Sequence, residues 1–304
     1  MNPAFEIQGG SGKPKWTGAA GALLLAAVLG LPLSAQAQAP FAKPDQAADA
    51  LVSALATSDE AALTRLFGSG WRQLMSLDEA NAENRYAFLQ KASQSRALSV
   101  KDGRGELTVG TDPWTLPVPI VQGKDGQWRF DPVAGRDAIA VRRIGANERA
   151  AIQASLAYVD AQREYALADR NGDGFVEYAQ KLMSSPGQRD GLYWSPSLGG
   201  ESPLGAGFLP ARPGEGYHGY RFKILTEQGP AARGGARSYF IGKRMASGFA
   251  LVAWPVQYGK TGVMSFMINQ DGAIFERDLG PQSAQAASAI KAFNPAEPWK
   301  QTQP

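Results

Sequence analysis

Apolar side chains between residues 44 and 91 recur at the three-to-four-residue spacing of helices that are buried along one side. The positions are Leu51, Val52, Leu55, Leu63, Leu66 and Phe67. Thr57 and Glu60 have the spacing of a capping box, which predicts that the second helix begins there. Gly68 predicts the end of that helix, and a third helix is expected over residues 79–91.

From residue 98 the apolar spacing changes to two, the period of strands that bury one face. The alternating positions are Leu98, Val100, Leu107, Val109, Trp114, Leu116, Val118 and Ile120. Asp102-Gly103 and Asp125-Gly126 separate these runs and predict tight hairpin turns. Helices followed by a meander of about four strands, closed by Trp128-Arg129-Phe130, indicate an α+β unit over residues 40–143.

A second unit of the same class is expected over residues 144–304. Apolar positions after Asn147 recur at helical spacing as far as Ala168, which predicts one long helix with Asn147 as its N-cap. Residues 184–216 are rich in Gly, Pro and Ser and show no period, so a long irregular segment is expected. Alternation returns from Tyr220 onward. The whole chain is therefore predicted to be α+β, with the second sheet antiparallel and packed on the long helix.

The first 39 residues have the order of a secretory signal peptide. Lys13 and Lys15 supply a positive start, an apolar run covers residues 19–33, and two overlapping A-x-A motifs follow. The motifs are Ala35-Gln36-Ala37 and Ala37-Gln38-Ala39. A retained membrane anchor is the alternative, but about 15 apolar residues are short for a bilayer span. We therefore expect a periplasmic or secreted protein with no membrane span after removal of residues 1–39.

Composition narrows the chemistry that an exported chain of this kind can perform. It has 304 residues, no cysteine and one histidine, which excludes disulfides, thiolate catalysis, iron–sulfur clusters and a multi-histidine metal centre. The net charge is +3, and loss of Lys13, Lys15 and Glu6 with the leader lowers it to +2. So small a charge gives no reason to expect nucleic acid or anionic lipid as a partner. A protein or polymer of the cell envelope is expected instead.

Several motifs along the chain resemble those of one bacterial family. They are Trp128-Arg129-Phe130-Asp131, Arg142-Arg143-Ile144-Gly145, Tyr158-Val159-Asp160-Ala161-Gln162-Arg163-Glu164-Tyr165, Tyr217-His218-Gly219-Tyr220 and Gln228-Gly229-Pro230. The family is the exported one catalogued as domain of unknown function 2950. The resemblance covers nearly all of the chain after the leader. It implies export and supplies no activity.

Two further resemblances concern the fold alone. The stretch from Gly219-Tyr220-Arg221-Phe222 to Asp271-Gly272-Ala273-Ile274 is similar to the sheet half of type IV pilin-like domains. The chain lacks the N-terminal assembly helix of true pilins, so polymerisation is not implied. Residues 41–131 look weakly like the nuclear-transport-factor-like cone, a scaffold with many uses, so neither likeness determines a function.

An acidic run after the long helix matches the first half of a calcium loop. Its candidate ligands are the side chains of Asp169, Asn171 and Asp173, the backbone carbonyl of Phe175, and Glu177 at the ninth position. Gln180 occupies the twelfth position, where the full motif has a bidentate Glu. Two interpretations stay open, a Ca²⁺ site of reduced affinity and a solvated helix terminus rich in Asp and Gly.

His218 is the one histidine of the chain, and histidine is the residue type that most often serves as a general base, which makes it the candidate general base. Asp190 and Glu201, in the irregular segment, are the candidate acids of a glycosidase-like pair. No G-x-S-x-G motif supplies a serine for a triad. The alternative for His218 is a structural role, in which it forms hydrogen bonds with nearby residues where the irregular segment meets the sheet. The alternative for the irregular segment is that its buried Trp and Tyr side chains only hold it in place.

The sequence favours an exported, non-enzymatic protein that binds a component of the cell envelope and is rigidified by calcium at the acidic loop. The alternative from another class is a periplasmic hydrolase of an envelope polymer that uses His218 and acids of residues 184–216. A third hypothesis is an adhesin-like surface module that requires calcium to bind its partner.

Overall fold

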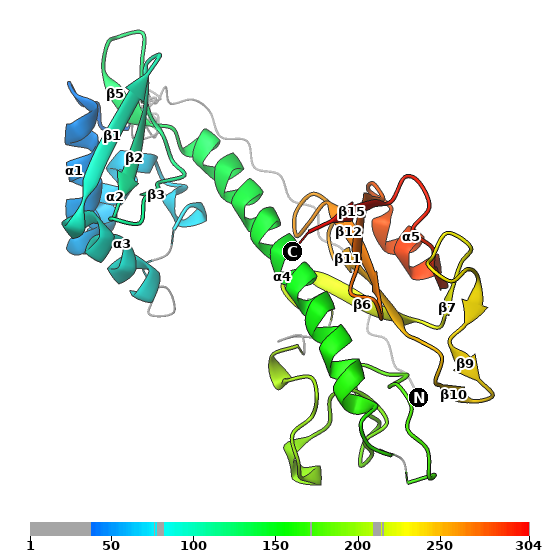
Figure 1. Ribbon diagram of the computed structural model, residues 1–304. Coiled ribbons are helices and arrows are strands. Elements are labelled where there is room, and N and C mark those ends of the chain that lie inside the picture. The colour runs from blue at the N-terminus through cyan, green and yellow to red at the C-terminus, as the bar shows by residue number, and fades with distance from the viewer. Residues whose placement is uncertain are drawn as a thin grey trace, which may run out of the picture.

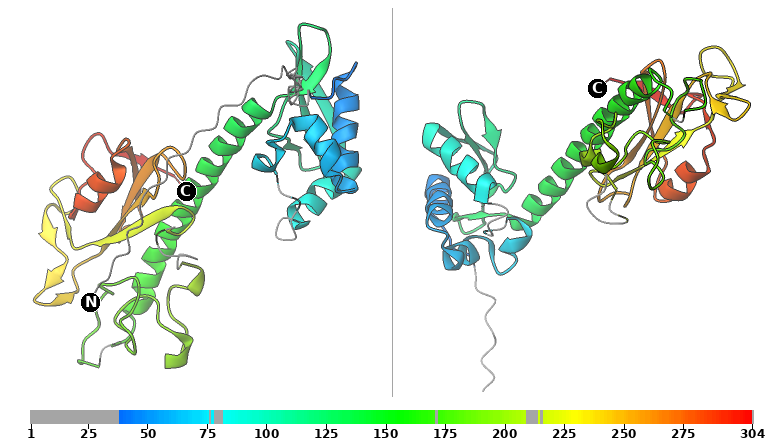
Figure 2. Two further views of the ribbon diagram at one scale, coloured as in Figure 1. Left: turned by 180° about the vertical axis from the view of Figure 1, so that it is seen from behind. Right: turned by 90° about the horizontal axis from the view of Figure 1, so that it is seen from below.

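The computed structural model describes residues 38–75, 77, 82–170, 172–208, 214 and 216–303 (Figure 1). Two lobes lie at opposite ends of one long helix, α4, which spans Pro132–Tyr165 (Figures 1 and 2). Each lobe has its own cluster of buried apolar side chains. The combination of helices with antiparallel sheets is the α+β architecture that the sequence predicts.

The N-terminal lobe packs three helices on a five-stranded sheet of order β1-β2-β4-β5, with β3 paired to β2. The helices are α1 (Pro44–Ala56), α2 (Glu60–Phe67) and α3 (Ala82–Gln94). The strands are β1 (Arg96–Lys101), β2 (Arg104–Val109), β3 (Trp114–Thr115), β4 (Ile120–Gln122) and β5 (Trp128–Phe130). Asp102 and Gly103 have φ of 49° and 73°, which confirms the tight turn between β1 and β2.

The capping box expected at Thr57 and Glu60 is wrong. Thr57 is the C-cap of α1, and its hydroxyl donates to the carbonyl of Ser53. Asp59 is the N-cap of α2 and accepts from the N–H of Ala62 at 2.9 Å. An aspartate satisfies a free N–H at a helix start as well as a threonine does, so residue type alone did not distinguish the two.

The C-terminal lobe is built on an antiparallel sheet of order β15-β13-β12-β11-β6. Its strands are β6 (Tyr220–Leu225), β11 (Ala250–Pro255), β12 (Met264–Asn269), β13 (Ile274–Asp278) and β15 (Lys300–Thr302). Smaller sheets join β14 (Ala292–Phe293), β7 (Glu227–Gln228) and β8 (Arg237–Ser238), and β9 (Phe240–Ile241) with β10 (Arg244–Met245). Helix α5 spans Ser283–Ala289.

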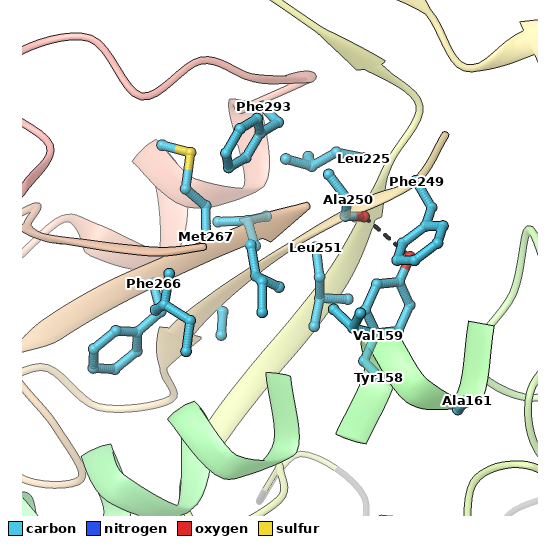
Figure 3. Close-up of a cluster of buried hydrophobic side chains, with 14 of the residues drawn as sticks. Tyr158, Val159, Ala161, Leu225, Phe249, Ala250, Leu251, Phe266, Met267 and Phe293 are labelled. Atoms are coloured by element: carbon cyan, nitrogen blue, oxygen red, sulfur yellow. Dashed lines mark hydrogen bonds between the residues drawn. The ribbon is translucent and has the colours of Figure 1, made fainter. Parts of the chain in front are cut away.

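The main sheet lies between α4 and α5 (Figures 1 and 2). All six residues of β11 are buried as a result. Figure 3 shows part of this core, where Leu251, Phe266 and Met267 lie among the helices and neighbouring strands. A central strand covered on both faces has no polar face, which is why its apolar residues run continuously.

Helix α4 begins sixteen residues earlier than expected, with its N-cap at Asp131 instead of Asn147. Asp131 is its N-cap and accepts from the N–H groups of Val133 and Ala134 at 3.1 and 3.0 Å. Asn147 therefore lies inside the helix rather than at its start. The helix also runs unbroken through the predicted boundary between residues 143 and 144, although Gly145 lowers its helix propensity there.

In the segment between α4 and β6, residues 184–216 are expected from the sequence to be irregular, and their described part holds two 3-10 turns, at Pro196–Leu198 and Ala206–Phe208, and no longer helix or strand. The side chains of Leu192, Trp194 and Leu204 are buried in the core of the lobe. Arg189 lies over the Trp194 ring and donates to the carbonyls of Leu198 and Gly199. These contacts support the interpretation that the segment holds itself in place.

A buried amide joins this segment to α4. Gln162 has no exposed surface, and its amide donates to the carbonyl of Ala179 at 2.8 Å and accepts from the N–H of Ala179 at 2.8 Å. The same amide donates to the Tyr158 hydroxyl, which in turn donates to the carbonyl of Ala250 in β11 (Figure 3). Helix, segment and sheet are thus connected by one set of hydrogen bonds.

Within the described residues, no helix combines the length and the apolar character that crossing a bilayer requires.

We expect Gln162→Leu to lower the free energy of unfolding by roughly 2–4 kcal/mol, because it leaves the buried N–H and carbonyl of Ala179 without partners. Gln153→Leu is the matched control, since Gln153 is exposed on the same helix and should change stability by less than about 0.5 kcal/mol. Urea unfolding of both variants measures the difference. Equal stability of the two would contradict the role of Gln162.

The N-terminal lobe includes two residues that the expected leader, 1–39, would remove. The Gln38 side-chain amide donates to the carbonyls of Leu66 and Phe130 at 3.1 and 3.3 Å. The N–H of Ala39 donates to the carbonyl of Arg65 at 2.7 Å. Residues 1–37 lie outside the described residues. Of the two A-x-A motifs, cleavage after Ala37 keeps these contacts and cleavage after Ala39 removes them.

We therefore predict that the leader is cleaved after Ala37 and that the processed chain begins at Gln38. N-terminal sequencing or intact mass of protein recovered from the envelope fraction distinguishes this from a chain that begins at Pro40. Recovery of a chain that begins at Pro40 would contradict the prediction. If that chain also unfolded at the same temperature as a chain that begins at Gln38, the Gln38 contacts would contribute nothing to stability.

Candidate functional site

Two adjoining cavities open beside the N-terminal end of β6, and together they are called here the β6 cleft. The first, the apolar chamber, is about 390 Å³. It is lined by Leu182, Met183, Phe208, Gly214, Gly216, Tyr217, Tyr220, Arg221, Phe222 and Trp254. The second, the polar chamber, is about 560 Å³. It is lined by Asn147, Gly207, Gly214, Gly216, Tyr217, His218, Gly219, Val256, Gln257 and Thr261.

Aromatic rings line the cleft, and Tyr217 lines both chambers. The rings of Phe208 and Tyr217 are stacked, with centroids 5.3 Å apart and planes 17° from parallel. The Phe208 ring also contacts the Phe222 ring, with a distance of 5.0 Å between the two centroids. The His218 ring stands edge-on to Tyr217 at 4.5 Å. Such contacts stabilise each other beyond the area they bury. The irregular segment and the edge strand thereby share one aromatic cluster.

A two-residue turn places His218 in the polar chamber. The backbones of Tyr217 and Tyr220 exchange two hydrogen bonds of 2.9 Å, and His218 and Gly219 both have positive φ, 46° and 72°. A Cβ at Gly219 would lie 2.6 Å from the Cβ of Thr261, so only glycine fits there. A histidine in the left-handed region costs on the order of 1 kcal/mol, and such strain is often found at functional sites.

Helix α4 supports the opposite side of the polar chamber. Asn147 donates to the carbonyl of Thr261 at 2.9 Å, and Glu148 accepts from the N–H groups of Val263 and Met264 at 2.9 and 3.0 Å. The Tyr220 hydroxyl donates to the carbonyl of Met264 at 2.8 Å. Burial, and secondarily the charge of Glu148, raise the pKa of Tyr220, so its hydroxyl keeps its proton. These bonds hold α4, β6 and β12 in a fixed relation around the cleft.

Arg221 and Trp254 form a directly opposed pair between β6 and β11. Trp254 is 7% exposed, and its indole N–H has no acceptor among the described residues. Arg221 is exposed, and its guanidinium makes no ion pair or hydrogen bond within the described part of the chain. The sequence pattern singles out neither Arg221 nor Trp254 as site residues, because cross-strand register is not visible in it.

Within the described part of the chain, no hydrogen bond or ion pair joins either candidate acid to His218, and neither acid lines a chamber. Asp190 accepts from Lys181 at 2.5 Å and from the N–H and hydroxyl of Ser185 at 2.7 and 2.9 Å. Burial acts to raise the pKa of Asp190, but these hydrogen bonds outweigh it and hold the pKa below its ordinary value. Glu201 is exposed. Among the described residues that line either chamber there is no carboxylate, so nothing there orients His218 as a base.

The carboxylates of the acidic loop form hydrogen bonds with backbone N–H groups of the loop and with an arginine. Asp169 accepts from the N–H groups of Gly172 and Gly174 at 2.7 Å each. Asp173 accepts from Arg244 at 2.9 and 3.0 Å, and the Arg244 guanidinium lies 4.0 Å from the centroid of the Phe175 ring. Among the described residues no three His, Asp or Glu side chains gather around one point. Asn171 lies outside the described residues, and Glu177 is half-buried.

Comparison with known proteins identifies a family. The family model described as "Protein of unknown function (DUF2950)" matches residues 38–302. No curated protein and no solved structure matches the chain.

Calcium binding at the acidic loop stays a prediction, and the structure adds a condition to it. A bound ion would compete with Arg244 for Asp173, so we expect Arg244→Gln to strengthen binding. At free calcium 100-fold above the dissociation constant, the ion would stabilise the fold by about 2.7 kcal/mol.

Thermal unfolding in EDTA and in millimolar calcium, with magnesium as the ionic control, measures this. Calcium should raise the unfolding temperature more in Arg244→Gln than in the natural chain, and it should leave the unfolding temperature of Asp169→Ala unchanged. No shift in any of the three proteins would show that the loop is a solvated helix terminus.

Proposed function

Because the chain belongs to the DUF2950 family, whose function is unknown, we propose a function from its own geometry: an exported protein of the cell envelope that binds a ligand in the β6 cleft without transforming it. The observation that carries the proposal is a cleft with an aromatic wall and no carboxylate among its described lining residues. The order of residues 1–39 supports export.

The composition of the cleft supports binding over catalysis. Binding pockets for small molecules typically combine an apolar, aromatic lining with a few polar groups, and they occupy about 300–1,000 Å³. The apolar chamber fits this description, and the amide side chains of Asn147 and Gln257 supply polar groups next to it. Hydrolysis would need a base that is oriented by an acid, and Asp190 is instead paired with Lys181.

The scaffold supports a pre-formed site. Binding is strongest when little ordering is needed, because immobilising side chains and loops lowers the affinity that remains. Here Tyr220, Glu148 and Asn147 are held by hydrogen bonds to β12 and to the turn that precedes it. The cleft therefore has its shape before a ligand arrives.

Titration with the neutral fluorophore N-phenyl-1-naphthylamine tests the site. We expect it to bind one site in the natural protein, and Met183→Arg to weaken it at least tenfold. Met183 lines the apolar chamber and is 56% exposed, so the change should leave the fold intact.

Leu167→Arg is the matched control, because Leu167 is 81% exposed and lines neither chamber. It should bind the fluorophore as the natural protein does. Absence of binding in the natural protein, or equal binding by the two variants, would overturn the proposal that the cleft is the ligand site.

A further inference from the structure

We propose that the ligand of the β6 cleft is an amphipathic carboxylate: an apolar body in the apolar chamber with a single carboxylate held by Arg221 and Trp254. The proposal rests on the proposed function, since it names the class of ligand for that same cleft.

The Arg221 guanidinium and the Trp254 indole can donate hydrogen bonds but cannot accept them. Arginine has five N–H donors and no acceptor, and the tryptophan indole has one donor and no acceptor. Arg221 and Trp254 are directly opposed in the β6–β11 register, so their side chains lie on the same face of the sheet. The indole nitrogen is buried and has no acceptor among the described residues, so a ligand reaches it when the side chains that cover it move aside. A ligand that satisfies this pair must present acceptors, and a carboxylate matches the planar guanidinium in two parallel bonds.

The charges around the cleft favour an anion. Arg221 is the single Lys or Arg among the described lining residues of both chambers, and they include no Asp or Glu. The guanidinium makes no ion pair within the described chain. A cationic ligand would meet this positive charge without compensation, and a neutral one would leave it without a partner. One arginine with one indole suits a monoanion better than a phosphate, which usually engages more donors.

The rest of the apolar chamber suits a hydrocarbon body. Leu182, Met183, Phe208 and Phe222 line it beside the arginine and the indole. A methionine and a ring that is only partly covered can adjust to an irregular apolar shape. Each methylene of the ligand that moves from water to such an apolar wall contributes about 0.8 kcal/mol to binding. The hydrocarbon body of the ligand therefore supplies affinity, and its carboxylate supplies selectivity.

The experiment is displacement of N-phenyl-1-naphthylamine by three ten-carbon compounds, all below their micelle-forming concentrations. They are decanoate, decanol and decyltrimethylammonium. Decanoate should displace the fluorophore at a concentration at least tenfold lower than decanol, and the cation should be weakest. Arg221→Gln should remove the difference between decanoate and decanol while leaving decanol unchanged.

Arg233→Gln is the matched control, because Arg233 is an exposed arginine of the same lobe that lines neither chamber. It should keep the preference for decanoate. Trp254→Phe, which removes the indole N–H, should weaken decanoate more than decanol.

The outcomes separate the two proposals. Equal displacement by decanoate and decanol, or equal behaviour of the Arg221 and Arg233 variants, would overturn the carboxylate while leaving the binding site in place. Failure of the fluorophore to bind the natural protein would overturn the proposed function itself.

Discussion

Gln162 lies where α4, the irregular segment and the sheet meet, and the C-terminal lobe depends on its amide. A buried amide without partners would destabilise the fold, so each of its bonds to Ala179 and Tyr158 restricts where the segment and the sheet can lie. Burial raises the pKa of Tyr158, so its hydroxyl keeps the proton that it donates to the carbonyl of Ala250. A segment without regular structure thereby obtains a defined path over the helix.

The β6 cleft follows from that arrangement. Strand β6 is at the edge of the main sheet, and exposed edges are usually covered or blunted in natural proteins. Here Phe208 from the irregular segment packs on Tyr217 and Phe222 beside the edge, which covers it incompletely and leaves the two chambers. The tight turn at His218 and Gly219 determines where the chain enters β6. A rigid sheet with an irregular segment lying across its edge is a common way to build a binding site.

The elements that were predicted correctly are those that local chemistry decides. The Asp102-Gly103 turn, the alternation of β2 and the irregular path of the described residues between 184 and 216, which hold only short 3-10 turns, all depend on neighbours in sequence. The errors have one cause in common. Thr57, Glu60 and Asn147 belong to residue types that often cap helix starts, but none of the three does so here, since Thr57 is the C-cap of α1 and Asn147 lies inside α4. Asn147 reaches across to Thr261, a contact 114 residues away, and no local pattern carries that information.

The sequence by itself determined the α+β class, the leader pattern, the family resemblance and the separation of helical from strand regions, because each depends on residue type and spacing. Only the tertiary structure decided that α4 is continuous from Pro132, that Asp190 pairs with Lys181 instead of meeting His218, and that Arg221 faces Trp254. Those facts depend on strand register and on contacts between distant segments. Register is set by the burial of whole faces, and it is reached only when the complete chain packs.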